Sequence, residues 1–123
     1  MTRNAAPATD LEITVDQDEE GSTVWLRGRL NLDSSPDLRD RLLALLRTPS
    51  ARAVTIDMEG LAYIDSSGMA TLIEALKTAR QQQTTLCLRG LQGGLLVLFQ
   101  ASGISTLFEQ NGCGSVSSVS KVS

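Results

Sequence analysis

The expected fold is decided by one stretch, Ala53-Val-Thr-Ile-Asp-Met-Glu-Gly-Leu-Ala-Tyr-Ile-Asp-Ser-Ser-Gly-Met69. Across 53–58, apolar residues alternate with small or polar ones, which is the period of a half-buried β-strand. After Ser67 the apolar spacing becomes that of an amphipathic helix, at Met69, Leu72, Ile73, Leu76 and Ala79. Between the two periods lies 65–68, Asp-Ser-Ser-Gly, which is typical of a helix start. We therefore predict a strand, a tight turn and a helix.

This turn has a chemical as well as a structural interpretation. A helix start leaves its first backbone N–H groups unpaired and carries a partial positive charge, so an anion is favoured there. Either Asp65 or Ser66 can act as the N-cap by accepting one of those hydrogen bonds. A phosphate on Ser66 or Ser67 would be held by the remaining backbone donors. The alternative is a well-capped helix with no further role.

The same residues resemble the signature of a known family. The segment from Ile56 to Met69 is similar to that of the STAS domain, the bacterial anti-sigma-factor antagonist module, in which a strand, a hydrophobic-Asp-Ser-Ser-Gly turn and a helix follow one another. The resemblance extends from about Leu11 to Phe108. It implies that Ser66, directly after the aspartate, is phosphorylated by an anti-sigma factor with serine kinase activity. The unmodified chain would bind that partner and free a sigma factor.

The resemblance also implies which residues contact the partner. Gly28-Arg29-Leu30-Asn31 is similar to the family's Gly-Glu-Leu-Asp segment, which lies beside the phosphorylated serine. Here Arg29 and Asn31 replace acidic residues, so the identity of the partner kinase is left open. The loss of negative charge near Ser66 should also make a phosphate there easier to hold. For Gly68 there are two interpretations, a close approach by the partner or an easing of the turn. The expected partner-binding residues are Arg29, Asn31, Asp65, Ser66, Ser67, Gly68 and Met69.

Alternation and helical spacing extend the prediction along the chain. We expect strands near 11–16, 23–27, 53–58 and 85–89, and an optional edge strand at Ile104–Phe108. Helices should begin at Ser35 as N-cap with Pro36 next, at the 65–68 turn, and at Leu95.

Each predicted strand is apolar on one face only, which does not suit a sheet covered by helices on both sides. We therefore predict an α/β fold with a single open mixed β-sheet of four or five strands and helices packed mainly on one face, similar to the STAS domain. Its domain would span 11–110, after a flexible leader at 1–10 and before a disordered Gly/Ser/Val tail at 111–123. The wetter sheet face should carry Thr14, Trp25, Arg27, Thr55, Asp57 and Arg89.

Composition excludes several classes of function. The 123 residues have a formal net charge of −3 and no histidine, so we expect no nucleic-acid partner, no catalytic site, no metal and no cofactor. Cys87 and Cys113 have neither a metal spacing nor a disulfide-framework pattern, and we expect Cys87 to be buried and reduced. We find no signal peptide and no apolar run of membrane-spanning length, so a cytoplasmic protein is expected without direct membrane insertion.

The run Leu95–Phe99 is entirely apolar, and a helix there cannot bury every side chain against one sheet. We expect the side of Leu95, Leu98 and Phe99 to be buried, with Leu96 and Val97 partly exposed for a partner or a homodimer contact. The alternative is a locally tight core. This run, with Arg29 and Asn31, keeps a second function open. The chain would then resemble the STAS subunits of ABC-type lipid transporters, in which the serine turn docks constitutively on the ATPase.

Overall fold

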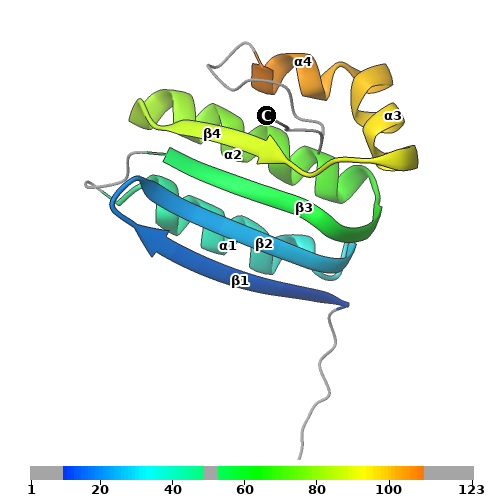
Figure 1. Ribbon diagram of the computed structural model, residues 1–123, viewed down its shortest axis with the longest axis horizontal. Helices are drawn as coiled ribbons and strands as arrows, with labels where there is room; N and C mark the ends of the chain where they lie inside the picture. Colours follow the sequence, from blue (N-terminus) through cyan, green and yellow to red (C-terminus); the bar gives the residue numbers. More distant parts are fainter. Residues whose placement is uncertain (1–9, 49–52, 110–123) are drawn as a thin grey trace, which may run out of the picture.

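The computed structural model describes residues 10–48 and 53–109. In chain order the elements are β1 Leu11–Asp18, β2 Gly21–Leu30, α1 Ser35–Leu46, β3 Ala53–Ile64, α2 Ser66–Gln82, β4 Thr85–Arg89, α3 Gly93–Ser102 and α4 Ile104–Glu109. The four strands form one sheet in the order β1-β2-β3-β4 (Figure 1). β1 and β2 form an antiparallel hairpin, whereas β2–β3 and β3–β4 are parallel pairs. The predicted open mixed sheet is confirmed.

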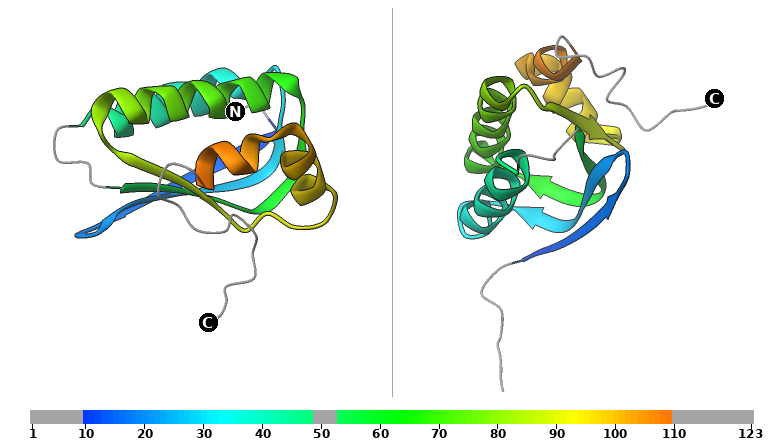
Figure 2. Two further views of the ribbon diagram at one scale, coloured as in Figure 1. Left: turned by 90° about the horizontal axis from the view of Figure 1, so that it is seen from above. Right: turned by 90° about the vertical axis from the view of Figure 1, so that its left-hand side faces the viewer.

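Helices lie on one side of this sheet. α1 and α2 run side by side over one face, while α3 and α4 pack at the β4 edge (Figures 1 and 2). The apolar strand residues that point toward these helices join a single apolar cluster, whose burial is the main driving force for folding. Fully buried members from the sheet and the helices include Val24, Leu30, Leu38, Leu42, Val54, Ile56, Leu72, Leu86, Phe99 and Phe108.

Strand β3 is longer than its alternating segment predicts. It continues to Ile64, and its pairing with β2 shifts register between Trp25 and Arg27 and again between Gly28 and Arg29. Such bulges insert extra residues on one strand and hide the simple period of two. Because β3 runs on beside β2 to Leu30, the turn that follows Ile64 lies next to the end of β2.

The expected edge strand at Ile104–Phe108 is wrong, because this segment forms helix α4. Gly103, at φ +83°, ends α3, and the chain then starts a new helix. Ile104 and Phe108 are four positions apart, so one helical face buries both against the core. In the part of the chain that the structure describes, no helix is long and apolar enough to cross a membrane.

Two helix starts also differ from expectation. Ser34, not Ser35, is the N-cap of α1, although Pro36 lies in the first turn as predicted. Helix α3 begins at Gly93, and Leu95 and Leu96 are half-buried around the buried Phe99. The expected exposure of Val97 is confirmed at 63 %, but Leu98 also points outward, so the prediction that it is buried is wrong.

The ends of the predicted domain can be compared only in part. Asp10, expected in the leader, is described, and its carbonyl accepts the Arg29 N–H at 3.2 Å. Residues 1–9 and the predicted tail at 111–123 lie outside the described residues.

On the open face of the sheet, Thr14, Trp25, Arg27 and Arg89 are exposed as expected, and Thr55 is half-buried. Asp57 is buried. The cost of burying its charge is offset because its carboxylate accepts hydrogen bonds from Arg89 and from the backbone N–H of Glu59. Cys87 is half-buried and disulfide-bonded, so the expectation of a buried, reduced thiol is wrong.

Candidate functional site

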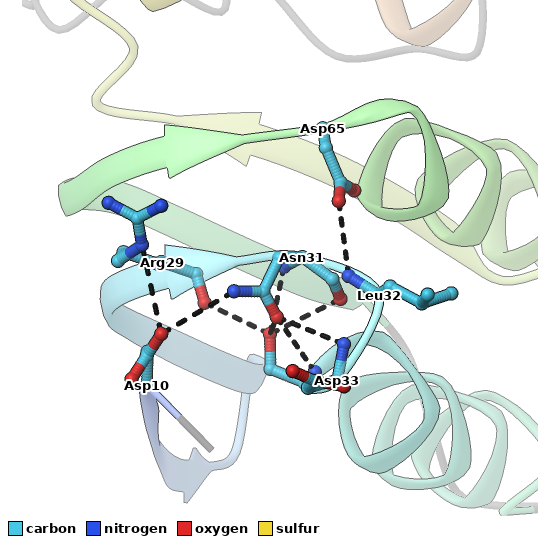
Figure 3. A network of polar contacts seen from close by, with 7 residues as sticks. Asp10, Arg29, Asn31, Leu32, Asp33 and Asp65 are labelled. Atoms are coloured by element: carbon cyan, nitrogen blue, oxygen red, sulfur yellow. Dashed lines mark hydrogen bonds and ion pairs between the residues drawn. The ribbon is translucent and has the colours of Figure 1, made fainter. Parts of the chain in front are cut away.

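The turn between β3 and α2 is organised by both carboxylate oxygens of Asp65. Oδ1 accepts the Gly68 N–H at 3.1 Å and so caps α2. Oδ2 accepts the Leu32 N–H at 3.1 Å (Figure 3). The backbone N–H of Asp65 donates to the Leu30 carbonyl at 3.1 Å. Of the two caps left open by the sequence, Asp65 is therefore the one formed. It also joins the start of α2 to the segment between β2 and α1.

That segment, residues 29–34, is held by its own side chains. Asn31 Oδ1 accepts the N–H groups of Asp33 and Ser34, at 3.0 and 3.1 Å (Figure 3). The Ser34 hydroxyl donates to the Arg29 carbonyl and accepts the Asn31 N–H, both at 2.9 Å. Asn31, expected to bind the partner, thus shapes the loop, and an aspartate is not needed there because an amide oxygen also accepts these bonds.

Arg29 lies on the open side of β2, opposite Tyr63 of β3. Its guanidinium lies 4.4 Å from the centroid of the Tyr63 ring, in cation–π contact. Its Nε is 3.7 Å from Asp10 Oδ2, and both of these charged side chains are about half exposed. This ion pair is weak because water screens it. The positive charge of Arg29 is therefore still accessible to an approaching anion.

The two serines of the turn differ in accessibility. Ser66 is exposed at the first position of α2, and its hydroxyl has no hydrogen-bond partner among the described residues. Ser67 is half-buried. Because Asp65 already caps the helix, the Ser66 hydroxyl is not required by the fold and is free to be modified.

Gly68 is buried and takes a structural role. A Cβ at this position would lie 2.7 Å from Ile64 Cγ1 and 2.7 Å from Leu30 Cγ. Of the two interpretations, a close approach by a partner does not fit, because side chains of the same chain already cover this residue. Glycine is needed here so that α2 can pack closely on the ends of β2 and β3.

Exposed apolar side chains surround the turn, and sequence reasoning missed two of them. Leu32 is 71 % exposed, and its N–H binds Asp65; Tyr63, two positions before Asp65, is 40 % exposed. Met69, which was expected at the site, is half-buried. The Asp65 bond to Leu32 joins residues 33 positions apart, which no local spacing could indicate. Together Arg29, Leu32, Tyr63 and Ser66 form what we call the turn surface.

Comparison with known proteins places this architecture in a family. The family model described as "Mlab, STAS domain" matches residues 13–109. The chain belongs to the STAS domain family. The matched residues include every strand and helix that builds the turn surface.

A curated relative and solved structures agree with this assignment. The anti-sigma-B factor antagonist of Listeria monocytogenes is 27 % identical over 94 residues, which cover 76 % of this chain and 82 % of the relative. An anti-sigma factor antagonist from Mycobacterium paratuberculosis has a similar fold, with TM-score 0.69 and 18 % identity over 85 % of this chain and 87 % of that one. The phosphorylated form of SpoIIAA, a Bacillus cell fate determinant, gives TM-score 0.63 and 15 % identity, covering 78 % and 87 %.

The acidic side chains of the described residues bear on two kinds of chemistry, a metal site and a catalytic base. Within residues 10–48 and 53–109, no group of three or more Cys, Asp or Glu side chains is placed to hold a metal ion. The Asp65 carboxylate is occupied by two N–H groups and is not poised as a base for Ser66. The exposed Leu32 and Tyr63 side chains beside Arg29 give the turn surface a composition that is frequent in protein contact surfaces.

Proposed function

We propose that this STAS domain is an anti-sigma-factor antagonist, a protein-binding regulator without enzymatic activity, controlled by phosphorylation of Ser66. The observation that carries the proposal is the exposed Ser66 hydroxyl, which has no hydrogen-bond partner among the described residues and follows an Asp65 carboxylate that is bonded within the fold. The names of the relatives support it, since the Listeria protein is an anti-sigma-B factor antagonist. The partner would be an anti-sigma factor with serine kinase activity.

The geometry indicates how the switch would act. Unmodified, the turn surface presents two apolar side chains, Leu32 and Tyr63, and the cation Arg29 around the Ser66 hydroxyl. Tyrosine and arginine are frequent energetic centres of protein interfaces. A phosphate on Ser66 would add about −1.5 to −2 charges and displace a partner that fits this surface. No refolding is needed, because the Asp65 cap and the Asn31 loop do not use the Ser66 hydroxyl.

Two features favour a second candidate function, that of a transporter subunit. Arg29 and Asn31 replace the acidic residues expected for a kinase partner, and Val97 and Leu98 of α3 are exposed. A constitutive STAS subunit of an ABC-type lipid transporter would use the turn to dock on the ATPase without phosphorylation. Recognition would then depend on Leu32, Tyr63 and Arg29 and not on the state of Ser66.

One experiment separates the two functions. The tagged chain is incubated in native lysate with ATP, captured, and analysed by intact mass and by mass spectrometry of bound proteins. We expect one added phosphate on Ser66, none in Ser66→Ala, and an unchanged modification in the matched variant Ser67→Ala. Ser66→Ala should still capture the partner, whereas Ser66→Asp should capture at least about tenfold less.

Two results would overturn the proposal. Phosphate found on Ser67 with Ser66 untouched would show that the switch residue is wrong. Capture of an ABC-type ATPase by an unphosphorylated chain, equal for the wild type and Ser66→Asp, would establish the transporter subunit instead.

A further inference from the structure

The face of the sheet that α1 and α2 leave open is arranged around Trp25. Its indole Nε1 donates to Asp16 Oδ2 at 3.0 Å, and the Arg89 guanidinium lies 5.1 Å from the ring centroid. Arg89 is fixed in turn by Asp57, with Nε and Oδ2 2.9 Å apart. Trp25 is nevertheless 39 % exposed. A tryptophan held in place and left open to solvent is typical of a binding surface.

Beside Trp25 the open face is hollowed. The hollow has a volume of about 410 Å³, and its lining includes Glu12, Thr14, Trp25, Arg27 and Glu59. It can take several small side chains of an extended segment. Excluding Asp57, which is paired with Arg89, the hollow has two carboxylates and one arginine, so it favours a segment with positive charge.

Cys87 lies on this same face. It is two positions before Arg89 on β4 and is paired with Thr55 of β3, so the alternation of a strand places it on the side of Arg89 and Trp25. Cys87 is disulfide-bonded, and the sequence has one other cysteine, Cys113. We propose that Cys113 is its partner and that the C-terminal segment, residues 110–123, docks on the open face of the sheet.

The length of chain after α4 fits this placement. The described chain ends with α4, which packs against β4, at Glu109. From there to Cys113 an extended chain spans up to about 14 Å, and a disulfide bridges a further ~5.5 Å between Cα atoms. Because α4 packs against β4, the strand that carries Cys87, this reach is compatible with a bridge between Cys113 and Cys87. Residues 114–123 could extend roughly 33 Å, whereas β4 and β2 are separated by about 10 Å, so the segment can reach the hollow.

The composition of the segment also fits. Residues 110–123 contain glycine, serine and valine, with no aromatic side chain, and Lys121 is their only charged side chain. Small side chains suit a shallow hollow, valine suits contact with the Trp25 ring, and a lysine suits Glu12 and Glu59. The segment thus complements the open face in size and in charge.

The docking would depend on redox state. A dithiol reductant would attack the disulfide, transfer two electrons and leave Cys87 and Cys113 as two thiols, while it is itself oxidised to a disulfide. The segment would then be released and Trp25 exposed to another binding partner. Reversible disulfides of this kind act as sensors where thiols are otherwise kept reduced.

Trp25 is the only tryptophan in the sequence, so its fluorescence reports directly on this face. Acrylamide quenching of the full chain is measured before and after addition of dithiothreitol, with intact mass under both conditions. We expect the untreated chain to be a monomer two hydrogens lighter than the reduced chain, and the quenching constant to rise at least about twofold on reduction. Cys113→Ser should show the high value throughout.

Two charge-reversal variants distinguish docking of the segment on the sheet from attachment through the disulfide alone. Lys121→Glu should raise quenching in the oxidised chain, whereas Lys77→Glu, an exposed position on α2, should not. Equal quenching in the oxidised and reduced wild type would overturn the docking. A covalent dimer under oxidising conditions would show that Cys87 pairs with a second copy of the chain. Two free thiols in the untreated chain would show that no disulfide attaches the segment. Either result overturns the proposal.

Discussion

Helices α2 and α3 begin in opposite ways. At α2, the Asp65 side chain caps the first turn, and Gly68 is packed beneath Leu30 and Ile64. At α3, the N-cap Gln92 makes no side-chain capping bond, and a Cβ on Gly93 or Gly94 would meet nothing within 4 Å. The first helix start is fixed by the rest of the fold, and the second is held mainly by the buried Phe99 farther along the helix.

The difference shows what each start can do. A modification site needs a frame that does not move when a group is added, and the bonded turn around Ser66 provides one. The start of α3 has no such frame, yet it presents Val97 and Leu98 to solvent. We interpret α2 as the place of the switch and α3 as an adaptable contact surface. The following substitutions test this contrast, from the largest expected effect on stability to the smallest.

Gly68→Val should have the largest effect. The new side chain would meet Ile64 and Leu30 at distances no real Cβ contact tolerates, so the chain must shift at a cost of about 1–3 kcal/mol. Urea denaturation measures this loss, and Gly94→Val, at an open position of α3, is the matched control. If a partner instead approached Gly68 closely, this substitution would weaken partner binding more than stability. A Gly68→Val chain as stable as the control would restore that interpretation and remove the contrast between the two helix starts.

Asp65→Ala should come next. It removes the cap of α2 and the acceptor for the Leu32 N–H, and a lost cap alone costs about 1 kcal/mol. Because the Leu32 bond is exposed, water can replace it, and we expect a total near 1–2 kcal/mol. Asp65→Asn should lose less, since its amide oxygen can still accept one of the two bonds. Equal stability of all three chains in thermal unfolding would show that Asp65 does not hold the turn.

The sequence predicted the turn but not the bonds that fix it. The strand, turn and helix were predictable because the apolar period changes from two to 3.6 within a few residues. The Asp65–Leu32 bond depends on loops brought together by the parallel pairing of β2 and β3. The buried Ser34 hydroxyl bonds to Arg29 and Asn31 within its own loop, and the sequence pattern did not indicate these partners. Ile104–Phe108 was misassigned because a short apolar run fits a strand or a helix, and only its packing against the core decides.

Gly94→Ala should stabilise the chain slightly. The added methyl group meets nothing, the backbone of Gly94 does not have the positive φ of Gly93, and alanine loses less entropy in a helix. We expect a gain of about 0.5 kcal/mol, smaller than in a helix interior because Gly94 lies in the first turn. Gly93→Ala, at φ +61°, is the control and should not gain. A loss of stability in Gly94→Ala would mean that this helix start is as tightly fixed as that of α2.

The double substitution Val97→Lys and Leu98→Lys should affect folding least and association most. Both side chains point to solvent, so charging them should change the free energy of unfolding by no more than about 0.5 kcal/mol. Helix α3 has no charged residue of its own, so two copies can meet through this apolar patch without like-charge repulsion, and two lysines would introduce it. Sedimentation should therefore show less self-association, and pull-down less partner if the patch binds one. The control pair, Leu95→Lys with Leu96→Lys, packs against the core and should lose stability clearly. If the outward pair unfolds the chain as much as the inward pair, both faces of α3 belong to the core, and this helix is not a contact surface.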